Sequence, residues 1–401
     1  MIVLGTHEVA VDLLEKRSAK YSDRVHSTMA YLTGWDWALP IIPYGAWWRR
    51  SRRAFHEHFN ASVIVRYRAV QLEAMGRFLR RLLESPEAFE RHIKHFIASS
   101  TIRLAYGVDV DKEEDTPYLE IATAAVATFA ATFVPGKYLV ETFPALRFLP
   151  SWMPGAQFKR DGQAWKPRVR RLQETPWNAC MSDMLFTTLM TFFLAMASYP
   201  EIQTRAQAEL DAVVGTNRLP HFDDAGAAPY VVALMKECTR WRVVIPFGIL
   251  HRSTEEDVYR GRRIPKGTIV VPNQWCVVPF SRALAEKGWL TNTGCARRAF
   301  TREERYYPDP EEFRPERYLK EGTCDPGVLD PGDIIFGADT EALHCCSPTS
   351  PVSACPGRDF AQAELFVVMA SVLHAFTIRP ARDAHGVPIP LESAMSDGAL
   401  S

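Results

Sequence analysis

CPGRDFA at residues 355–361 is followed by the apolar run LFVVMA at residues 365–370. Together they predict a helix over 356–376 that starts directly after Cys355, because proline suits the first helical turn. Free backbone N–H groups and the macrodipole at a helix start favour the thiolate over the thiol. Gly357 leaves the backbone bare, so that a flat group can approach closely. Haem-thiolate iron needs a thiolate that faces a flat cofactor, whereas an isolated match is also explained by a buried structural thiol.

Two charged motifs precede this helix. The first is Glu237-x-x-Arg240 in a predicted helix over 230–241, where the two side chains are i,i+3 neighbours and can pair. The second is FRPERY at 313–318, in which Pro315 forces an extended bend and Arg317 can reach the same carboxylate. The alternative for each motif is a solvated surface ion pair.

Glu-x-x-Arg, Pro-Glu-Arg-Tyr and Cys-x-Gly, in this order over 120 residues, resemble the cytochrome P-450 superfamily of haem-thiolate monooxygenases, and fungal microsomal members most of all. WRRSRR at 48–53 resembles the family's Trp-x-x-x-Arg, and IPKGT at 264–268 resembles its small β-region. The resemblance runs from near residue 1 to near residue 395. It implies a mostly α fold, the cytochrome P-450 fold, with a large helical domain and a small β-region.

The resemblance also implies roles for individual residues. Cys355 would be the axial iron ligand, and Trp48 and Arg52 would hydrogen-bond a haem propionate, with His251 a candidate for the other propionate. The buried charge network that fixes the loop beneath the haem would consist of Glu237, Arg240 and Arg317. The implied cofactor is haem b (iron protoporphyrin IX), with electrons from NADPH through a reductase. The implied reaction inserts one oxygen atom from O2 into an apolar small molecule, in fungal secondary metabolism or xenobiotic oxidation.

Composition is compatible with this class. The 401 residues are 47% hydrophobic, without repeats or a Gly/Ser linker, which favours one domain over residues 1–401. Lys+Arg and Asp+Glu are equal at 47 each, which argues against nucleic acid as a partner. A solvated helix face is the favoured interpretation of Arg49, Arg50 and Arg53, ahead of a docking patch for an acidic redox partner. The eight cysteines show no secreted-type framework, which indicates a reducing compartment.

Two other chemistries have weaker support. His344-Cys345-Cys346 together with Cys355 offers ligands for zinc, but no Cys-x-x-Cys pair or second histidine completes the site. Asp223-Asp224 after Phe222 is the only feature that suggests an all-α prenyl-diphosphate enzyme, and no further acid follows at useful spacing.

The remaining pattern is mostly helical. Apolar periodicity predicts helices over 8–17, 48–60, 63–83, 87–106, 118–133, 166–173, 184–199 and 201–214. Strands are predicted over 1–5, 257–263 and 268–275. An aromatic, proline-punctuated stretch over 135–154 contains Tyr138, Phe143, Phe148 and Trp152. The resemblance makes this stretch the roof over the substrate, while ordinary packing is the favoured interpretation of each single residue.

Three departures from the family pattern raise the question of activity. Phe336 and Cys355 are nineteen positions apart, and the suspected insertion over 339–354 contains no arginine. The longer loop costs only about 0.9 kcal/mol in closure entropy. A second suspected insertion covers 276–298. A suspected deletion near 178–181 shortens the distal helix, where Asp183 fills the family's acid position but Met184 occupies the threonine position.

The fold is therefore expected to be incomplete at the N-terminus, before the distal helix and at the C-terminus. A catalytically impaired haem-binding relative, or a mis-spliced gene model without turnover, is the alternative function. No stretch approaches the ~20 apolar residues of a membrane-spanning helix. Relatives are anchored in the endoplasmic reticulum membrane, whereas this sequence lacks the anchor, so a cytoplasmic or peripheral location is expected.

Overall fold

A computed structural model describes residues 1–107, 109, 118–133, 137–174, 179–274, 299–336, 355–383, 385–389 and 391. The described chain is mostly helical with three small sheets, which confirms the predicted fold class. The suspected insertions over 276–298 and 339–354 fall outside the described residues. The suspected deletion near 178–181 lies at the edge of another undescribed segment, 175–178.

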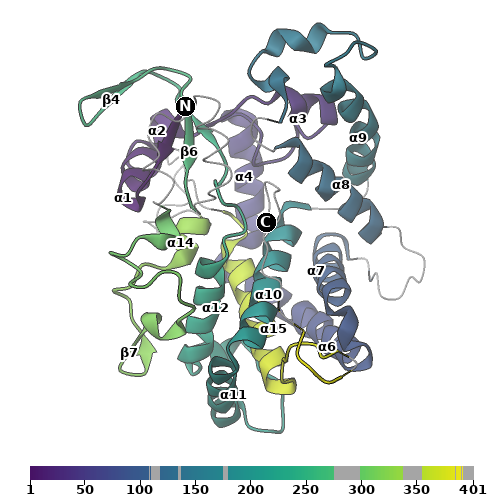
Figure 1. The fold of residues 1–401 in the computed structure, drawn as a ribbon, viewed down its shortest axis with the longest axis vertical. Coiled ribbons are helices and arrows are strands. Elements are labelled where there is room, and N and C mark those ends of the chain that lie inside the picture. Colours follow the sequence, from purple (N-terminus) through teal and green to yellow (C-terminus); the bar gives the residue numbers. More distant parts are fainter. Residues whose placement is uncertain are drawn as a thin grey trace.

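The main core surrounds α15 (Arg358–Ala375). Every residue from Glu364 to Leu373 on this helix is buried, as expected for a helix that is apolar on all sides. Its neighbours are α6 (Arg68–Glu84), α10 (Ala179–Ser198), α11 (Pro200–Val214) and α12 (Pro229–Trp241). Figure 1 shows α10 and α12 beside α15, with α11 at its far end. The segment that carries the Cys-x-Gly motif therefore enters the centre of the molecule.

The N-terminal segment and the small β-region form one four-stranded sheet. Its order is β1 (Ile2–Leu4), β6 (Ile269–Pro272), β3 (His251–Arg252) and β2 (Asp23–Arg24). β1 is parallel to β6, and β2 is antiparallel to β3. The register places Arg24 opposite His251, although 227 residues separate them in the chain. This pairing brings distant polar side chains to one end of the site described below.

Several sequence-based predictions of element boundaries were wrong. The helix predicted over 8–17 is broken into α1 (His7–Ala10), a π-helical turn (Val11–Glu15) and α2 (Ser18–Tyr21). The strand predicted over 257–263 is a hairpin of β4 (Asp257–Tyr259) and β5 (Arg262–Ile264). The chain reverses at Arg260 and Gly261, whose φ angles of 49° and 74° suit a two-residue hairpin turn.

The other predicted helices agree with the structure to within a few residues, apart from one. The matching helices are α4 (Ala46–Phe59), α6 after a short α5 (Ala61–Ile64), α7 (Phe89–Tyr106), α8 (Tyr118–Thr132), α10, α11 and α12. The exception is α9 (Gln157–Glu174), which starts nine residues before its predicted start and contains Pro167 in its interior. Figure 1 shows α9 beside α8 and the short α3 (Thr28–Thr33) in one helical unit.

The aromatic stretch that follows α8 only partly agrees with ordinary packing. Tyr138 is buried and its hydroxyl donates to Asp161 Oδ2 at 2.8 Å, as that interpretation predicts. The interpretation of ordinary packing is wrong for Phe143, Phe148 and Trp152, whose exposed fractions lie between 59% and 77%. This part of the chain, which contains the 3₁₀ turns Leu139–Glu141 and Pro144–Phe148, therefore presents aromatic side chains to the outside.

Within the described residues, no single helix has the length and apolar character to cross a membrane. Only the pair Leu185–Ser198 and Pro200–Val214 meets both criteria, and its two helices meet at 106°.

Candidate active site

Cys355 lies in a turn just before α15 rather than in its first helical turn. The helix begins at Arg358, two residues later than predicted, and Pro356 and Gly357 form the connection. The backbone N–H of Cys355 donates to the carbonyl oxygen of Phe336 at 2.5 Å, which holds the turn against the end of α14 (Pro331–Ile335). The cysteine is partly buried and lines a cavity.

Burial outweighs the helix start in setting the charge state of this thiol. Burial raises the pKa of Cys355, while the backbone N–H of Gly357 and the positive charges of Arg52 and Arg358 oppose that rise. The helix start thus favours the thiolate as expected, but burial acts on the pKa of Cys355 in the opposite direction. A bound metal ion is a much stronger local charge and deprotonates a coordinating thiol outright.

Helix α4 brings two of the predicted haem-binding residues to the same cavity. Trp48 is buried, and the Arg52 guanidinium lies one turn further on, 6.0 Å from the Trp48 ring centroid. Both residues line the cavity together with Cys355. Arg49, Arg50 and Arg53 are exposed on the opposite side of α4, as the interpretation of a solvated face predicts.

His251 also lines the cavity, but its hydrogen bonds make it a support for another residue. Its Nδ1 lies 2.8 Å from the carbonyl oxygen of Tyr21, and its Nε2 lies 3.0 Å from Arg24 Nη1. Burial and the neighbouring Arg24 charge lower the pKa of His251 to about 3, so the imidazole is neutral. The network then assigns the proton to Nδ1 and leaves Nε2 as the acceptor for Arg24. His251 has no N–H left for an anion, and the residue it orients is Arg24.

Arg24 is the cavity residue that sequence reasoning missed. Its Nε is buried and has no hydrogen-bond partner among the described side chains and backbone. Burial and the nearby Arg52 charge lower its pKa to about 10. Two guanidinium groups at one end of a cavity are costly unless an anion joins them. No local pattern marks Arg24, because only the β2–β3 register places it there.

The cavity as a whole fits an iron porphyrin. Its cationic end, formed by Arg24 and Arg52 with the Trp48 indole, suits two carboxylates, and Cys355 supplies a soft ligand on the wall. The remaining wall is largely apolar, as a macrocycle requires, and includes Leu39, Pro40, Ile245, Ile249, Ile334, Ile335 and Phe336. Arg24, Trp48, Arg52 and Cys355 would therefore hold haem b, which when bound supplies the activation of O2.

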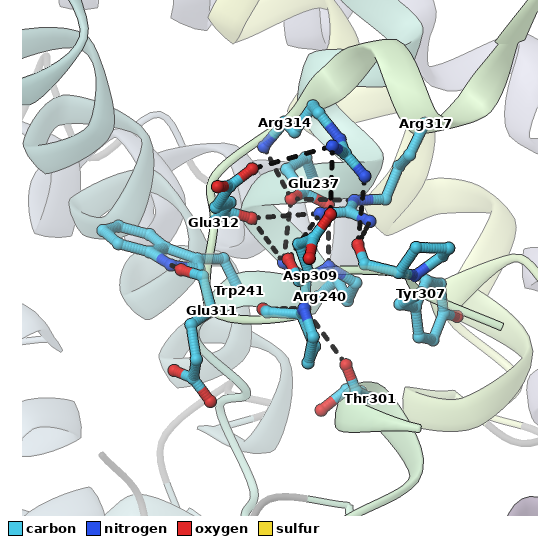
Figure 2. A network of polar contacts seen from close by, with 12 residues as sticks. Glu237, Arg240, Trp241, Thr301, Tyr307, Asp309, Glu311, Glu312, Arg314 and Arg317 are labelled. Atoms are coloured by element: carbon cyan, nitrogen blue, oxygen red, sulfur yellow. Dashed lines mark hydrogen bonds and ion pairs between the residues drawn. The ribbon is translucent and has the colours of Figure 1, made fainter. Parts of the chain in front are cut away.

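The predicted charge network forms between α12 and the 299–318 segment (Figure 2). Arg240 Nε and Nη2 donate to the two Glu237 carboxylate oxygens, both at 2.8 Å, and Arg317 Nε donates to Glu237 Oε1 at 3.2 Å. The side chains of Glu237 and Arg240 are 0% exposed and that of Arg317 is 3% exposed. The alternative of a solvated ion pair is therefore wrong for both motifs.

The network also fastens the 299–318 segment, whose only regular structure consists of the 3₁₀ turns Phe300–Arg302 and Pro315–Tyr318. Arg240 donates to the carbonyl oxygens of Thr301, Pro310 and Glu312 at 2.7 to 3.1 Å. Arg317 donates to those of Pro308, Asp309 and Glu312 at 2.6 to 3.2 Å. Figure 2 shows Glu237 between Arg240 and Arg317, with Thr301, Asp309 and Glu312 of the 299–318 segment around the two arginines. The two arginines thus satisfy loop carbonyls that have no sheet or helix partners.

Asp183, the remaining predicted site residue, has a side chain whose position the structure does not describe. Asp183 belongs to α10 by its backbone, but its side chain and that of Met184 lie outside the described part of the chain. The catalytic role of Asp183 therefore stays a prediction. The zinc alternative rests on residues 344–346, which are also outside the described segments; among described residues no group of three or more His, Cys, Asp or Glu side chains could hold a metal.

The two acids of the prenyl-diphosphate alternative have structural partners. Asp223 pairs with Arg68 at 2.8 Å, and Asp224 pairs with Arg218 at 2.7 Å while accepting the backbone N–H of His221. Both lie in the 3₁₀ turn Phe222–Gly226, in which Asp224 forms a capping box with His221. Neither acid faces the cavity that contains Cys355.

These features define a haem-thiolate protein, and comparison with known proteins agrees. The Cytochrome P-450 family model matches residues 182–278 and 296–396, and its gap, 279–295, lies within the suspected insertion over 276–298. A cytochrome P-450 monooxygenase of Coprinopsis cinerea, COX2, is 36% identical over 98% of this chain and 77% of its own length. The tryptamine 4-monooxygenase of Psilocybe cyanescens is 32% identical over 99% of this chain and 80% of its own length. The cytochrome P-450 monooxygenase claR of Ampulloclitocybe clavipes is 32% identical over the whole chain and 76% of its own length.

This chain belongs to the cytochrome P-450 family. Its relatives are named as monooxygenases, which are oxidoreductases that incorporate molecular oxygen, and they come from fungi. Both findings confirm the sequence-based resemblance, and the prenyl-diphosphate alternative was wrong.

Proposed function

We propose that this chain inserts one atom of O2 into an apolar small molecule of fungal secondary metabolism, with electrons from NADPH through a reductase. The observation that supports the proposal is the placement of Cys355 on the same cavity as Arg24, Trp48 and Arg52, because these side chains suit the iron and the two carboxylates of one haem. The relatives add the substrate chemistry: one is named for hydroxylating position 4 of tryptamine. Indole amines are therefore the first substrates to offer.

Reconstitution tests the proposal directly. Holoprotein, a fungal NADPH-dependent reductase and isotopically heavy O2 should give products that carry one heavy oxygen atom from a panel of indoles and other apolar small molecules. Without reductase or NADPH the product should disappear, since both electrons enter through that route. Steady NADPH oxidation without oxygenated product from any panel member would instead support the impaired relative.

Met184 supplies the matched variant for this experiment. The family resemblance places a proton-guiding threonine at this position, and methionine has no hydroxyl. Met184→Thr should therefore raise the ratio of product formed to NADPH consumed. An unchanged ratio in an active protein would show that proton delivery does not depend on this position.

We also propose that the protein associates peripherally with a membrane through the stretch over 137–154. Leu139, Phe143, Phe148 and Trp152 are all more than half exposed. Basic side chains flank them on the same stretch and at the start of α9, namely Lys137, Arg147, Lys159 and Arg160. Aromatic and aliphatic tips bordered by basic residues are typical of proteins that lie in the interface of anionic membranes.

Vesicle flotation tests this location. The protein should float with vesicles that contain phosphatidylserine more than with neutral ones, and the triple variant Phe143→Ser, Phe148→Ser, Trp152→Ser should stay in the soluble fraction. Trp47→Ser is the matched control, because Trp47 is an isolated aromatic residue, 59% exposed, on α4. Equal flotation of the triple variant and the wild type would rule out this stretch as the contact.

A further inference from the structure

A single acid is buried in the helix that follows the cysteine. Glu364 on α15 is 1% exposed and lies between the fully buried stretches of the main core. Its Oε2 has no hydrogen-bond partner among the described residues, and no ion pair reaches it from them. An ionised carboxylate in such a place would lose its hydration without a cation to offset that loss.

The contact between Glu364 and Ser100 indicates whether the Glu364 carboxyl group is protonated. Ser100 Oγ on α7 is 3.0 Å from Glu364 Oε1 and 3.1 Å from the carbonyl oxygen of Ile97. A hydroxyl has one proton and cannot donate to both acceptors. If Glu364 is protonated, it donates to Ser100 Oγ and Ser100 donates to Ile97, so both short contacts become hydrogen bonds. If Glu364 is ionised, Ser100 can donate to only one of its two neighbours, and the other short contact then joins two oxygen atoms that have no proton between them.

The described side chains of the helices around α15 supply no charge that would change this conclusion. Among the charged side chains described there, Arg77 and Arg103 pair with Glu73, Arg240 with Glu237, and His374 with Asp211. Asp223 of the Phe222–Gly226 turn is 71% exposed and pairs with Arg68. His92 of α7 contacts Ser85 at 2.8 Å. Among the described residues, burial alone raises the pKa of Glu364, to about 8, and the Ser100 contact opposes it.

We propose that Glu364 is a protonated carboxylic acid in the native protein, that it fastens α15 to α7 through Ser100, and that its ionisation at alkaline pH loosens this helix. A movement of α15 would affect the cofactor site through two contacts. α15 continues directly from the Cys355 turn, and its Phe360 packs edge-on against Phe59 of α4 with ring centroids 5.9 Å apart. α4 is the helix that carries Trp48 and Arg52. The Glu364–Ser100 contact is therefore pH-sensitive, and this property does not depend on which substrate the protein oxidises.

The sign of the pH dependence follows from proton binding. The folded protein keeps the Glu364 proton up to pH about 8, whereas the unfolded chain releases it near the ordinary carboxyl value of 4.5. Between these values the unfolded state binds fewer protons, so stability falls as the pH rises. This contribution to stability is complete below pH about 4.5 and is lost by pH about 8.

The test compares wild-type holoprotein with Glu364→Gln, which keeps the shape and a hydrogen-bond donor but cannot ionise. Between pH about 5 and 8, the unfolding equilibrium constant of the wild type should rise relative to the variant by about tenfold per pH unit. Glu87→Gln, on the exposed turn Pro86–Ala88, makes the same chemical change at the surface and should follow the wild type. Parallel pH profiles of wild type and Glu364→Gln would overturn the proposal.

Infrared spectroscopy gives a readout that needs no unfolding. At pH 6 the wild type should show the carbonyl band of a buried protonated carboxylic acid, which shifts in D2O, is absent from Glu364→Gln and fades above pH about 8. Ser100→Ala should keep the band but move its frequency, because the acid loses its acceptor. A band that is equally strong in Glu364→Gln would assign the proton to another residue and defeat the inference.

Discussion

Replacing Cys355 by alanine should abolish the thiolate-type Soret band of the reduced, carbon monoxide-treated protein. Cys355 is the described cysteine that lines the cavity with Arg24, Trp48 and Arg52, and thiolate ligation is what shifts this band. The expected loss is complete, because alanine has no ligand atom. Any haem that remains should show the spectrum of a protein without a thiolate ligand. The measurement is the difference spectrum of equal amounts of folded protein.

Two matched variants separate the ligand from the rest of the cavity. Cys324→Ala removes a partly buried cysteine elsewhere and should leave the band unchanged. Arg24→Met should keep the band but release haem to apomyoglobin at least about tenfold faster, since it removes charge-assisted hydrogen bonds worth about 1.5–3 kcal/mol. Wild-type and Cys355→Ala proteins with the same spectrum would contradict the ligand assignment, whereas Arg24→Met with wild-type haem release would contradict only the propionate role.

The parts of the site that depend on local backbone geometry could be predicted from the sequence. Glu237 and Arg240 are three residues apart in a strongly amphipathic helix, so helix geometry alone brings their side chains together. Arg317 follows from Pro315, which fixes the local bend of its turn. In each case the interaction depends on a local conformation that a few residues determine.

The cationic end of the cavity could not be predicted in the same way. Arg24 meets His251 only because β2 and β3 pair in a particular register, and strand register is a property of the whole sheet. For the same reason the sequence pointed to His251 as a candidate for the second propionate and not to Arg24, the residue that His251 contacts while its other ring nitrogen bonds to Tyr21. The balance between burial and the helix start at Cys355 is likewise a property of the packed protein.

Local sequence signals also failed where one residue type is compatible with two backbone conformations. Pro167 predicts a helix break, yet α9 continues through it, because packing against α3 and α8 outweighs one lost backbone hydrogen bond. Arg260 is a polar residue in a strand-like run, but with Gly261 it adopts positive φ and reverses the chain. Tertiary contacts decide both cases.

Replacing Arg240 by methionine should destabilise the protein by about 3–5 kcal/mol, a large share of the ~5–15 kcal/mol that holds a typical protein folded. The substitution leaves the Glu237 carboxylate fully buried, with only Arg317 and a backbone N–H as partners. It also removes the donors for the carbonyl oxygens of Thr301, Pro310 and Glu312. The yield of folded holoprotein and its urea unfolding midpoint measure the effect.

The nearby pair of Arg205 and Glu316 provides the control for this argument. Their 2.9 Å contact has the same chemistry, but the side chains are 58% and 39% exposed, so Arg205→Met should cost no more than about 1 kcal/mol. Arg240→Lys should behave like Arg240→Met rather than like the control, because an ammonium group cannot bind both Glu237 oxygens and the loop carbonyls at once. Equal unfolding midpoints for Arg240→Met and Arg205→Met would mean that burial of the network contributes nothing, and that the loop over 299–318 is held by other contacts.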